Sequence, residues 1–297
     1  MSNQLSRRLF IQKSVVTGVG IAAIPSFLSA HSVKKDQKIR LGLVTYQWAK
    51  DWDLPTIIAN CEKAGITGVE LRTQHAHGVE INLTARQRAE VKKRFADSSV
   101  TCIGYGSNFE FHSPDAANVR ENIEQTKGYI KLCKDIGASG IKVKPNNLPD
   151  EVPKEKTIAQ IAASFNEIGK FAQDYGQLIR VEVHGRKTCE LPNMKAIFDQ
   201  VTEPNVKICW NSNPQDLLPP GIEANFNMVK KWIGDTTHVH GMYANEYPFQ
   251  KLFNLFAGIK YNGWILLEET TTPPDKIVAL KEQLALFNKL VDNAYNG

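Results

Sequence analysis

Four polar side chains stand near the C-terminal ends of four β-type runs in the second half of the chain. They are Glu182, Asn211, His240 and Glu268. Two carboxylates, one amide oxygen and one imidazole form a donor set that suits a divalent ion such as Mn²⁺, Mg²⁺ or Co²⁺. Singly, a strand-end histidine is more often a hydrogen-bonded core residue, and a strand-end glutamate is more often a salt-bridge partner. A metal site is therefore predicted only if the fold brings the four side chains together.

Side-chain alternation indicates which polar residues of each predicted strand share one face. Successive residues of a strand point to opposite faces, so residues two apart lie on the same face. The pairs that share a face in this way are Glu70 with Arg72, Lys142 with Lys144, Glu182 with His184, Cys209 with Asn211, His238 with His240, and Leu266 with Glu268. We expect the interior of a barrel to be apolar except near these strand ends, where the loops build the active site.

One pattern repeats eight times after a short polar linker at 33–38. A β-branched run is followed each time by a segment of helical period, and the runs start about 30 residues apart, as βα units require. The predicted strands are 39–46, 68–72, 100–105, 140–144, 179–184, 206–211, 237–242 and 264–268. The predicted helices lie near 54–64, 84–97, 115–136, 155–175, 192–200, 224–232, 249–257 and 274–293. Gly65 and Gly137 end two of these helices, and Pro114 precedes the third helix.

Eight such units predict an α/β fold, a single closed (β/α)₈ barrel with its active site at the C-terminal ends of the strands. The length of 297 residues suits one barrel of about 250 residues plus a leader. An open doubly wound sheet is the alternative fold, but no G-x-G-x-x-G follows the first strand to support it.

The first 32 residues are predicted to be a cleaved export signal. Residues 6–12 read S-R-R-L-F-I-Q, which resembles the twin-arginine signal S-R-R-x-F-L-K, and a weakly apolar stretch follows from Val15 to Ala30. That stretch is too short for a membrane span of about 20 residues, so we expect no stable membrane anchor. The domain assignment is a twin-arginine-type signal at 1–32 and a barrel at 33–297. We expect contact with the twin-arginine export machinery and a periplasmic or otherwise exported protein; the alternative is an uncleaved amphipathic N-terminus.

The charge of the chain argues against a nucleic-acid partner, and its cysteine content argues against structural zinc. Arg7, Arg8 and Lys13 supply three of the net +5 charges, which leaves about +2 for the barrel. A nucleic-acid partner usually needs a clustered basic face, so we expect none. The five cysteines are odd in number and show no C-x-x-C spacing, and most fall in apolar segments. We therefore expect mostly buried free thiols and no structural zinc.

The chain is similar to the xylose-isomerase-like TIM-barrel superfamily of sugar isomerases and epimerases over about residues 39–293. The segments that carry the resemblance are G-V-E-L-R at 68–72, V-E-V-H at 181–184, I-C-W-N at 208–211, H-V-H at 238–240 and G-W-I-L-L-E at 263–268. The resemblance implies metal ligation by Glu182, Asn211, His240 and Glu268, with Asn211 where the family has aspartate. That change lowers the ligand charge, so the metal should bind more weakly; the alternative is a metal site that has decayed.

The resemblance also implies a reaction. Glu182 and Glu268 would be the catalytic acid and base that move a proton next to a carbonyl, assisted by the divalent metal. Epimerisation, isomerisation and elimination share this step. The residues expected to bind the substrate's hydroxyls are Arg72, His75, His77, Glu110, Lys144, His184 and Tyr243. A neutral keto-sugar, glycoside or polyol derivative is the expected substrate, because export and the lack of a Gly-rich phosphate loop disfavour a sugar phosphate.

Two other functions remain as alternatives at this point. A non-catalytic periplasmic carbohydrate-binding barrel would need no metal. An endonuclease of the apurinic-site type shares the fold, but it needs more His and Asp ligands and a basic DNA-binding face, whereas this chain has seven histidines. The sequence leaves open whether the protein is a homo-oligomer.

Overall fold

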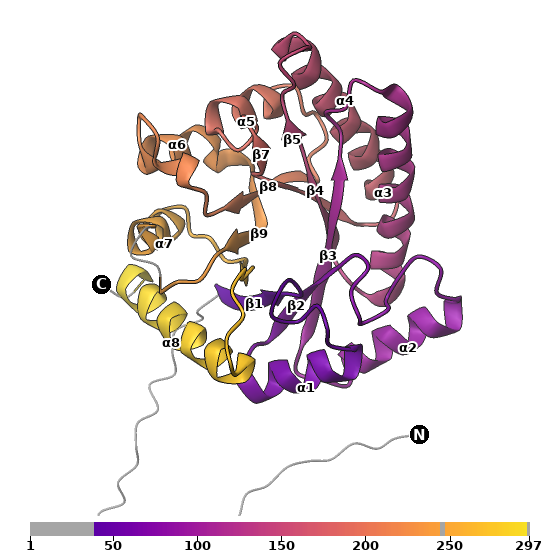
Figure 1. Ribbon diagram of the computed structural model, residues 1–297, viewed down its shortest axis with the longest axis vertical. Helices are drawn as coiled ribbons and strands as arrows, with labels where there is room; N and C mark the ends of the chain where they lie inside the picture. Colours follow the sequence, from indigo (N-terminus) through magenta and orange to yellow (C-terminus); the bar gives the residue numbers. More distant parts are fainter. Residues whose placement is uncertain (1–38, 244–246, 296–297) are drawn as a thin grey trace, which may run out of the picture. The chain divides into compact units, whose positions relative to one another are not determined.

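The computed structural model describes residues 39–243 and 247–295. They form a closed barrel of eight parallel strands with helices between successive strands. The strands stand at the centre and helices α1 to α8 form an outer ring around them (Figure 1). The predicted (β/α)₈ barrel is therefore confirmed. The predicted export signal at 1–32 lies outside the described residues.

The barrel strands follow one another around the ring in chain order. They are β1 (Arg40–Val44), β2 (Gly68–Arg72), β3 (Thr101–Glu110), β4 (Gly140–Lys144), β6 (Leu178–Glu182), β8 (Val206–Asn211), β9 (Ile233–Val239) and β10 (Trp264–Leu267). β10 pairs with β1 to close the barrel. Two residues each of β5 (Asn146–Asn147) and β7 (Gly185–Arg186) form a separate parallel pair after β4 and β6.

The helices begin and end close to the predicted positions. They are α1 (Leu54–Ala64), α2 (Ala85–Ala96), α3 (Ala116–Ile136), α4 (Lys154–Gln173), α5 (Leu191–Phe198), α6 (Ile222–Val229), α7 (Phe249–Gly258) and α8 (Lys276–Tyr295). The side chain of Asp53 accepts a hydrogen bond from the backbone N–H of Thr56 and so caps α1. Gly65 and Gly137 end α1 and α3 in the left-handed conformation, as predicted.

β3 continues to Glu110, five residues past its predicted end at 105, and β6 and β9 also depart from their predicted ranges. β6 ends at Glu182 rather than at His184, because Gly185 turns aside to pair with Asn146 in the β5–β7 pair. β9 begins at Ile233 and ends at Val239, so His240 stands in the loop that follows. The shifts of β6 and β9 leave the functional side chains at the mouth of the barrel, at the C-terminal ends of the strands.

The apolar core lies between the barrel and the ring of helices. A large cluster joins outward-facing strand residues such as Val143 and Val181 to helix residues such as Phe165. A second, smaller apolar cluster comprises Val44, Ile103, Trp264 and Leu266. Among the described cysteines, Cys189 is partly buried and the other four are buried; all five are free thiols, as expected.

The interior of the barrel is more polar than expected. Arg180 lies two residues before Glu182 on β6 and is 1% exposed. Its guanidinium donates two hydrogen bonds to the carboxylate of Asp235, at 2.9 and 2.7 Å, and a third to the backbone oxygen of Ile103. The expectation of an apolar interior below the mouth is therefore wrong here, because Asp235 pairs with the buried charge.

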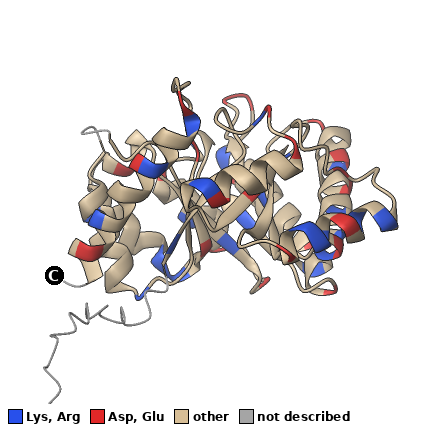
Figure 2. Ribbon diagram, turned by 90° about the horizontal axis from the view of Figure 1, so that it is seen from below, with Lys and Arg blue, Asp and Glu red and all other residues tan. Residues whose placement is uncertain are grey.

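Charge is mixed on the outside of the molecule. Lys and Arg are interspersed with Asp and Glu over the helices in the view of Figure 2. Within the described ranges 39–243 and 247–295, no helix combines the length and apolar character that crossing a membrane would require.

Candidate functional site

A polar pocket of about 210 Å³ opens at the C-terminal ends of the strands. It is lined by Tyr46, Arg72, Lys144, Glu182, His184, Asn211, Asn213, His240, Glu268 and Thr270. Each residue lies at or just after the end of a barrel strand, where (β/α)₈ enzymes carry their active sites. All four predicted metal ligands therefore meet in one pocket.

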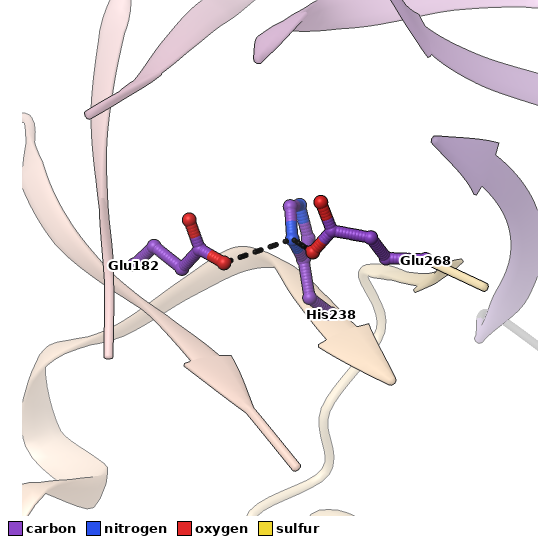
Figure 3. Close-up of side chains that lie close together, drawn as sticks. All are labelled: Glu182, His238 and Glu268. Atoms are coloured by element: carbon purple, nitrogen blue, oxygen red, sulfur yellow. Dashed lines mark hydrogen bonds and ion pairs between the residues drawn. The ribbon is translucent and has the colours of Figure 1, made fainter. Parts of the chain in front are cut away.

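A second histidine, His238, lies beside the carboxylates of both glutamates. One ligand atom each of Glu182, His238 and Glu268 lie within 4.8 Å of one another. The imidazole of His238 stands between the two carboxylates (Figure 3). Its Nδ1 lies 3.0 Å from Glu268 Oε2 and 3.6 Å from Glu182 Oε1. Alternation placed His238 on the same face as His240, but it was not among the predicted ligands.

The ring of His240 is oriented by a contact with the backbone. Its Nδ1 lies 3.2 Å from the backbone oxygen of Glu268, which can only accept a hydrogen bond. In the neutral tautomer that this contact selects, Nδ1 carries the proton and Nε2 has the unshared electron pair. A metal-binding histidine commonly donates its other N–H to a carbonyl in this way.

Each glutamate also has a cationic partner in the barrel. Lys142 Nζ lies 2.6 Å from Glu182 Oε2, and both side chains are at most 1% exposed. Lys144 Nζ lies 3.8 Å from the same oxygen. Arg72 donates a hydrogen bond to Glu268 Oε1. These contacts hold the carboxylates in place and balance their charge inside the barrel.

The same neighbours set the protonation of the glutamates. Burial alone raises the pKa of Glu182, but Lys142 and His238 outweigh burial and hold it well below its ordinary value. Burial and Glu182 also act to raise the pKa of Glu268, yet His238 outweighs them and lowers it to about 2. Both carboxylates are therefore ionised at neutral pH, as a metal ligand or a general base must be.

The pKa values of two basic side chains of the site, Lys144 and His238, are shifted in opposite directions. Burial, and then the charge of Lys142, lowers the pKa of Lys144 to about 8. Burial also acts to lower the pKa of His238, but Cys209, Glu70 and other neighbours raise it well above the ordinary value. The imidazole of His238 is thus protonated between carboxylates in this arrangement.

Glu70 supports His238 from below. This β2 residue is fully buried, and its Oε1 lies 3.2 Å from His238 Nε2. Gly106 on β3 makes room for it, because a Cβ there would lie 2.6 Å from Glu70 Oε1. Both ring nitrogens of His238 therefore lie within ion-pair distance of a carboxylate, although Nε2 and the Glu70 oxygens make no hydrogen bond.

The donor atoms of the pocket fit a divalent cation. The amide oxygen of Asn211 is buried without a hydrogen-bond partner, while its Nδ2 donates to Glu182 Oε1 at 3.2 Å. Glu182 and Glu268 supply two carboxylates, and His240 supplies a free Nε2. An unpartnered buried oxygen beside two carboxylates is the kind of position at which an ion satisfies the donors.

The structure separates the predicted substrate-binding residues into two groups. Arg72, Lys144 and His184 line the pocket. Burial lowers the pKa of His184, which favours its neutral form. Glu110 is not among the lining residues, and it accepts a hydrogen bond from Asn146.

The other three predicted substrate-binding residues do not line the pocket. His77 accepts a hydrogen bond from Val79 N at 3.0 Å and holds the oxygen of Arg72 at 2.7 Å, so both ring nitrogens are used to shape the loop after β2. His75 lies in the same loop, and burial followed by the charge of Arg72 lowers its pKa to about 4. Tyr243 is 49% exposed and its hydroxyl donates to Glu282 on α8.

Three lining residues were missed at the sequence level. Tyr46 ends the first predicted strand, Asn213 follows Asn211 by two residues, and Thr270 follows Glu268 by two. The period of two that selected Asn211 and Glu268 continues into the loops and would have found them. The eighth strand has the predicted register: Glu268 lines the pocket, while Glu269 is buried elsewhere and accepts from Thr271 Oγ1 at 3.2 Å.

Comparison with known proteins points to sugar isomerases. The family model described as xylose isomerase-like TIM barrel matches residues 58–213. An inosose isomerase of Bacillus velezensis is 23% identical over 141 residues, which is 48% of this chain and 50% of that enzyme. The chain thus spans about half the length of the curated relatives it matches.

Solved structures show the same fold at low identity. A structure of L-ribulose 3-epimerase superposes with a TM-score of 0.73 at 16% identity, covering 87% of this chain and 96% of the other. A structure of the IOLI protein with a bound zinc atom gives 0.66 at 16% identity, covering 86% of this chain and 98% of the other.

Proposed function

This chain belongs to the xylose isomerase-like TIM-barrel family, and we propose that it moves a proton at a carbon next to a carbonyl of a non-phosphorylated keto-sugar or keto-glycoside. The observation that carries the proposal is the mouth pocket, which Glu182 and Glu268 line together with Asn211, whose buried amide oxygen has no hydrogen-bond partner. The names of the isomerase and epimerase relatives support this class of reaction. Epimerisation, isomerisation and elimination all begin with such a transfer.

Glu182, Asn211, His240 and Glu268 would hold the divalent ion. His240 is preferred to His238 because its Nε2 is free, whereas both nitrogens of His238 face carboxylates. When bound, the ion would supply Lewis-acid stabilisation of negative charge on the substrate oxygens. Mn²⁺, Mg²⁺ and Co²⁺ suit this donor set, and the zinc-containing IOLI structure adds Zn²⁺ to the ions to be tested.

The residues of the pocket would carry out proton transfer, substrate orientation and positioning of the carboxylates. Ionised Glu182 or Glu268 would take the proton from the substrate carbon as a general base and return it as the conjugate acid, a role that contributes about 10²–10⁴-fold. Arg72 and Lys144 are hydrogen-bond donors that orient substrate oxygens from the pocket wall. Lys142 and His238 keep the two carboxylates ionised and fixed in direction.

Solvent exchange tests this function whichever product is formed. The protein is incubated in D₂O with Mn²⁺ and a panel of neutral keto-sugars and keto-glycosides, and deuterium at the carbon next to the carbonyl is measured by NMR. We expect exchange with at least one compound and its loss after chelation. Saturable binding without exchange would instead support a carbohydrate-binding barrel.

We also propose export through the twin-arginine pathway, supported by Arg7 and Arg8 before an apolar run. Replacing both arginines with lysine should trap the precursor in the cytoplasm, which cell fractionation would detect. Normal export of the double variant would contradict this proposal.

A further inference from the structure

Three polar residues, one of which lines the pocket, form one hydrogen-bonded chain. Glu110 ends β3, Asn146 belongs to β5, and His184 follows β6. The Nδ2 of Asn146 donates to Glu110 Oε2, and the Oδ1 of Asn146 lies 2.8 Å from His184 Nδ1. Of the three, His184 alone is among the residues that line the pocket.

The chemistry of these groups determines where the protons lie. An ionised carboxylate only accepts hydrogen bonds, so the NH₂ group of Asn146 must face Glu110. The amide oxygen of Asn146 must then face His184. Because an amide oxygen also only accepts, Nδ1 of His184 carries the proton and Nε2 keeps its electron pair.

The backbone keeps this chain of contacts in place. Asn146 and Gly185 have φ values of 70° and 95°, in the left-handed region. The two residues pair directly in the β5–β7 ladder, and any Cβ on Gly185 would overlap the backbone of Asn146. Glu110 is in register with Lys144, which places its carboxylate beside the start of β5.

We infer that Glu110 and Asn146 are positioning residues that hold His184 in the Nδ1–H form, so that the pocket wall presents Nε2 as an acceptor for a substrate hydroxyl. The inference rests on the proposed function for its hydroxylated ligand. It adds a specificity element, because Arg72 and Lys144 on the same pocket are donors only. A substrate with a hydroxyl at this position is preferred to its deoxy analogue, since the latter leaves Nε2 unpaired.

The tautomer of His184 can be observed directly. The full-length protein is labelled with ¹⁵N in its histidine rings, and ring nitrogens are assigned by NMR with a His184→Gln variant. We expect His184 to show a protonated Nδ1 and an unprotonated Nε2. Asn146→Gly keeps the left-handed backbone but removes the amide, so the spectrum should change to a mixture of tautomers. Glu110→Leu should have the same effect, because it frees the amide to flip.

Asn147→Gly is the matched control. Asn147 is the other residue of β5, and its side chain contacts exposed Arg186 at 3.4 Å. This variant should leave the His184 signals unchanged. A native spectrum with protonated Nε2, or an Asn146→Gly spectrum identical to the native one, would overturn the positioning role.

D-fructose serves as the hydroxylated probe in a second measurement. Its addition should move the His184 Nε2 resonance as that nitrogen accepts a hydrogen bond, and Asn146→Gly should weaken the binding at least several-fold. Signals that move at His240 but stay fixed at His184 would overturn the acceptor role. A complete lack of D-fructose binding would overturn the acceptor role for this ketose, whereas the exchange panel decides the proposed function and the tautomer result decides the positioning role.

Discussion

Glu268 and Glu269 are adjacent glutamates in different surroundings, which makes them a matched pair. Glu268 lines the pocket and contacts Arg72 and His238, whereas Glu269 contacts Thr271 away from the pocket. Glu268→Gln should lower turnover at least about 10²-fold through loss of a general acid or base. Glu269→Gln should stay within a few-fold of the native rate. The reverse result would contradict the strand register, and two active variants would contradict the proton-transfer mechanism.

Glu182→Gln should lower turnover by a similar factor, and the structure adds a second effect. A strand-end position alone suggests little change in stability, but Lys142 would be left buried without its counter-charge. Removing one partner of a buried ion pair costs about 3–5 kcal/mol of the free energy of unfolding. Urea unfolding should detect this loss, and adding Lys142→Met should restore much of it without restoring turnover.

The residue at position 211 should affect both the metal affinity of the site and the gain in thermal stability on metal binding. Its Nδ2 donates to Glu182 in the structure, so Asn211→Asp replaces a donor with a second negative charge beside that carboxylate. Without metal, we expect the variant to melt at a lower temperature than the native protein. When Mn²⁺ is added, the melting temperature of the variant should rise by more than that of the native protein. Calorimetry should show tighter binding. Unchanged or weaker affinity would mean that Asn211 is not a ligand.

At the scale of the elements, Arg180 on β6 and Asp235 on β9 link two strands that are not neighbours in the barrel. Asp235→Asn leaves the buried Arg180 charge without its partner and should cost about 3 kcal/mol, since Asp235 is itself partly exposed. Glu167→Gln is the control, because its pair with Arg120 on α3 has similar geometry at the surface. Urea unfolding should find a much smaller loss there. Equal losses would mean that burial does not set the strength of the Arg180 pair.

At the scale of the whole molecule, one buried acid should make stability depend on pH. Burial raises the pKa of Asp216 to about 8, although Tyr247 and Asn213 donate to its carboxylate. Between its unfolded pKa of 3.8 and about 8, the folded state binds the extra proton, so stability falls as the pH rises. The contribution is at most about 1.4 kcal/mol per pH unit.

Asp216→Asn should remove this dependence. The variant's free energy of unfolding, measured relative to the native protein in urea, should increase steadily from pH 5 to pH 8. Asp174→Asn, at an exposed position on the C-terminal side of α4, should show no such trend. A flat difference for Asp216→Asn would show that Asp216 is ionised in the folded protein at pH 5.

Local patterns in the sequence were sufficient for the barrel and for most of the pocket. The ranges predicted for β2, β4, β8 and α1 match the structure. Alternation placed Glu182, Asn211, His240 and Glu268 on one inner face, because the period of two is a property of the strand itself. The closed ring then follows from eight parallel units, and it brings these strand ends together.

Only the tertiary structure decided which partners these side chains meet. Arg72 and Glu268 are 196 residues apart in the chain, and no local pattern relates them. The insertion of His238 between two glutamates, the polar contacts of Arg180, and the position of Glu110 behind Asn146 depend on strand register and on loop backbone in the left-handed region. These properties arise from contacts between distant segments, whereas the sequence pattern reports only the face on which each residue lies.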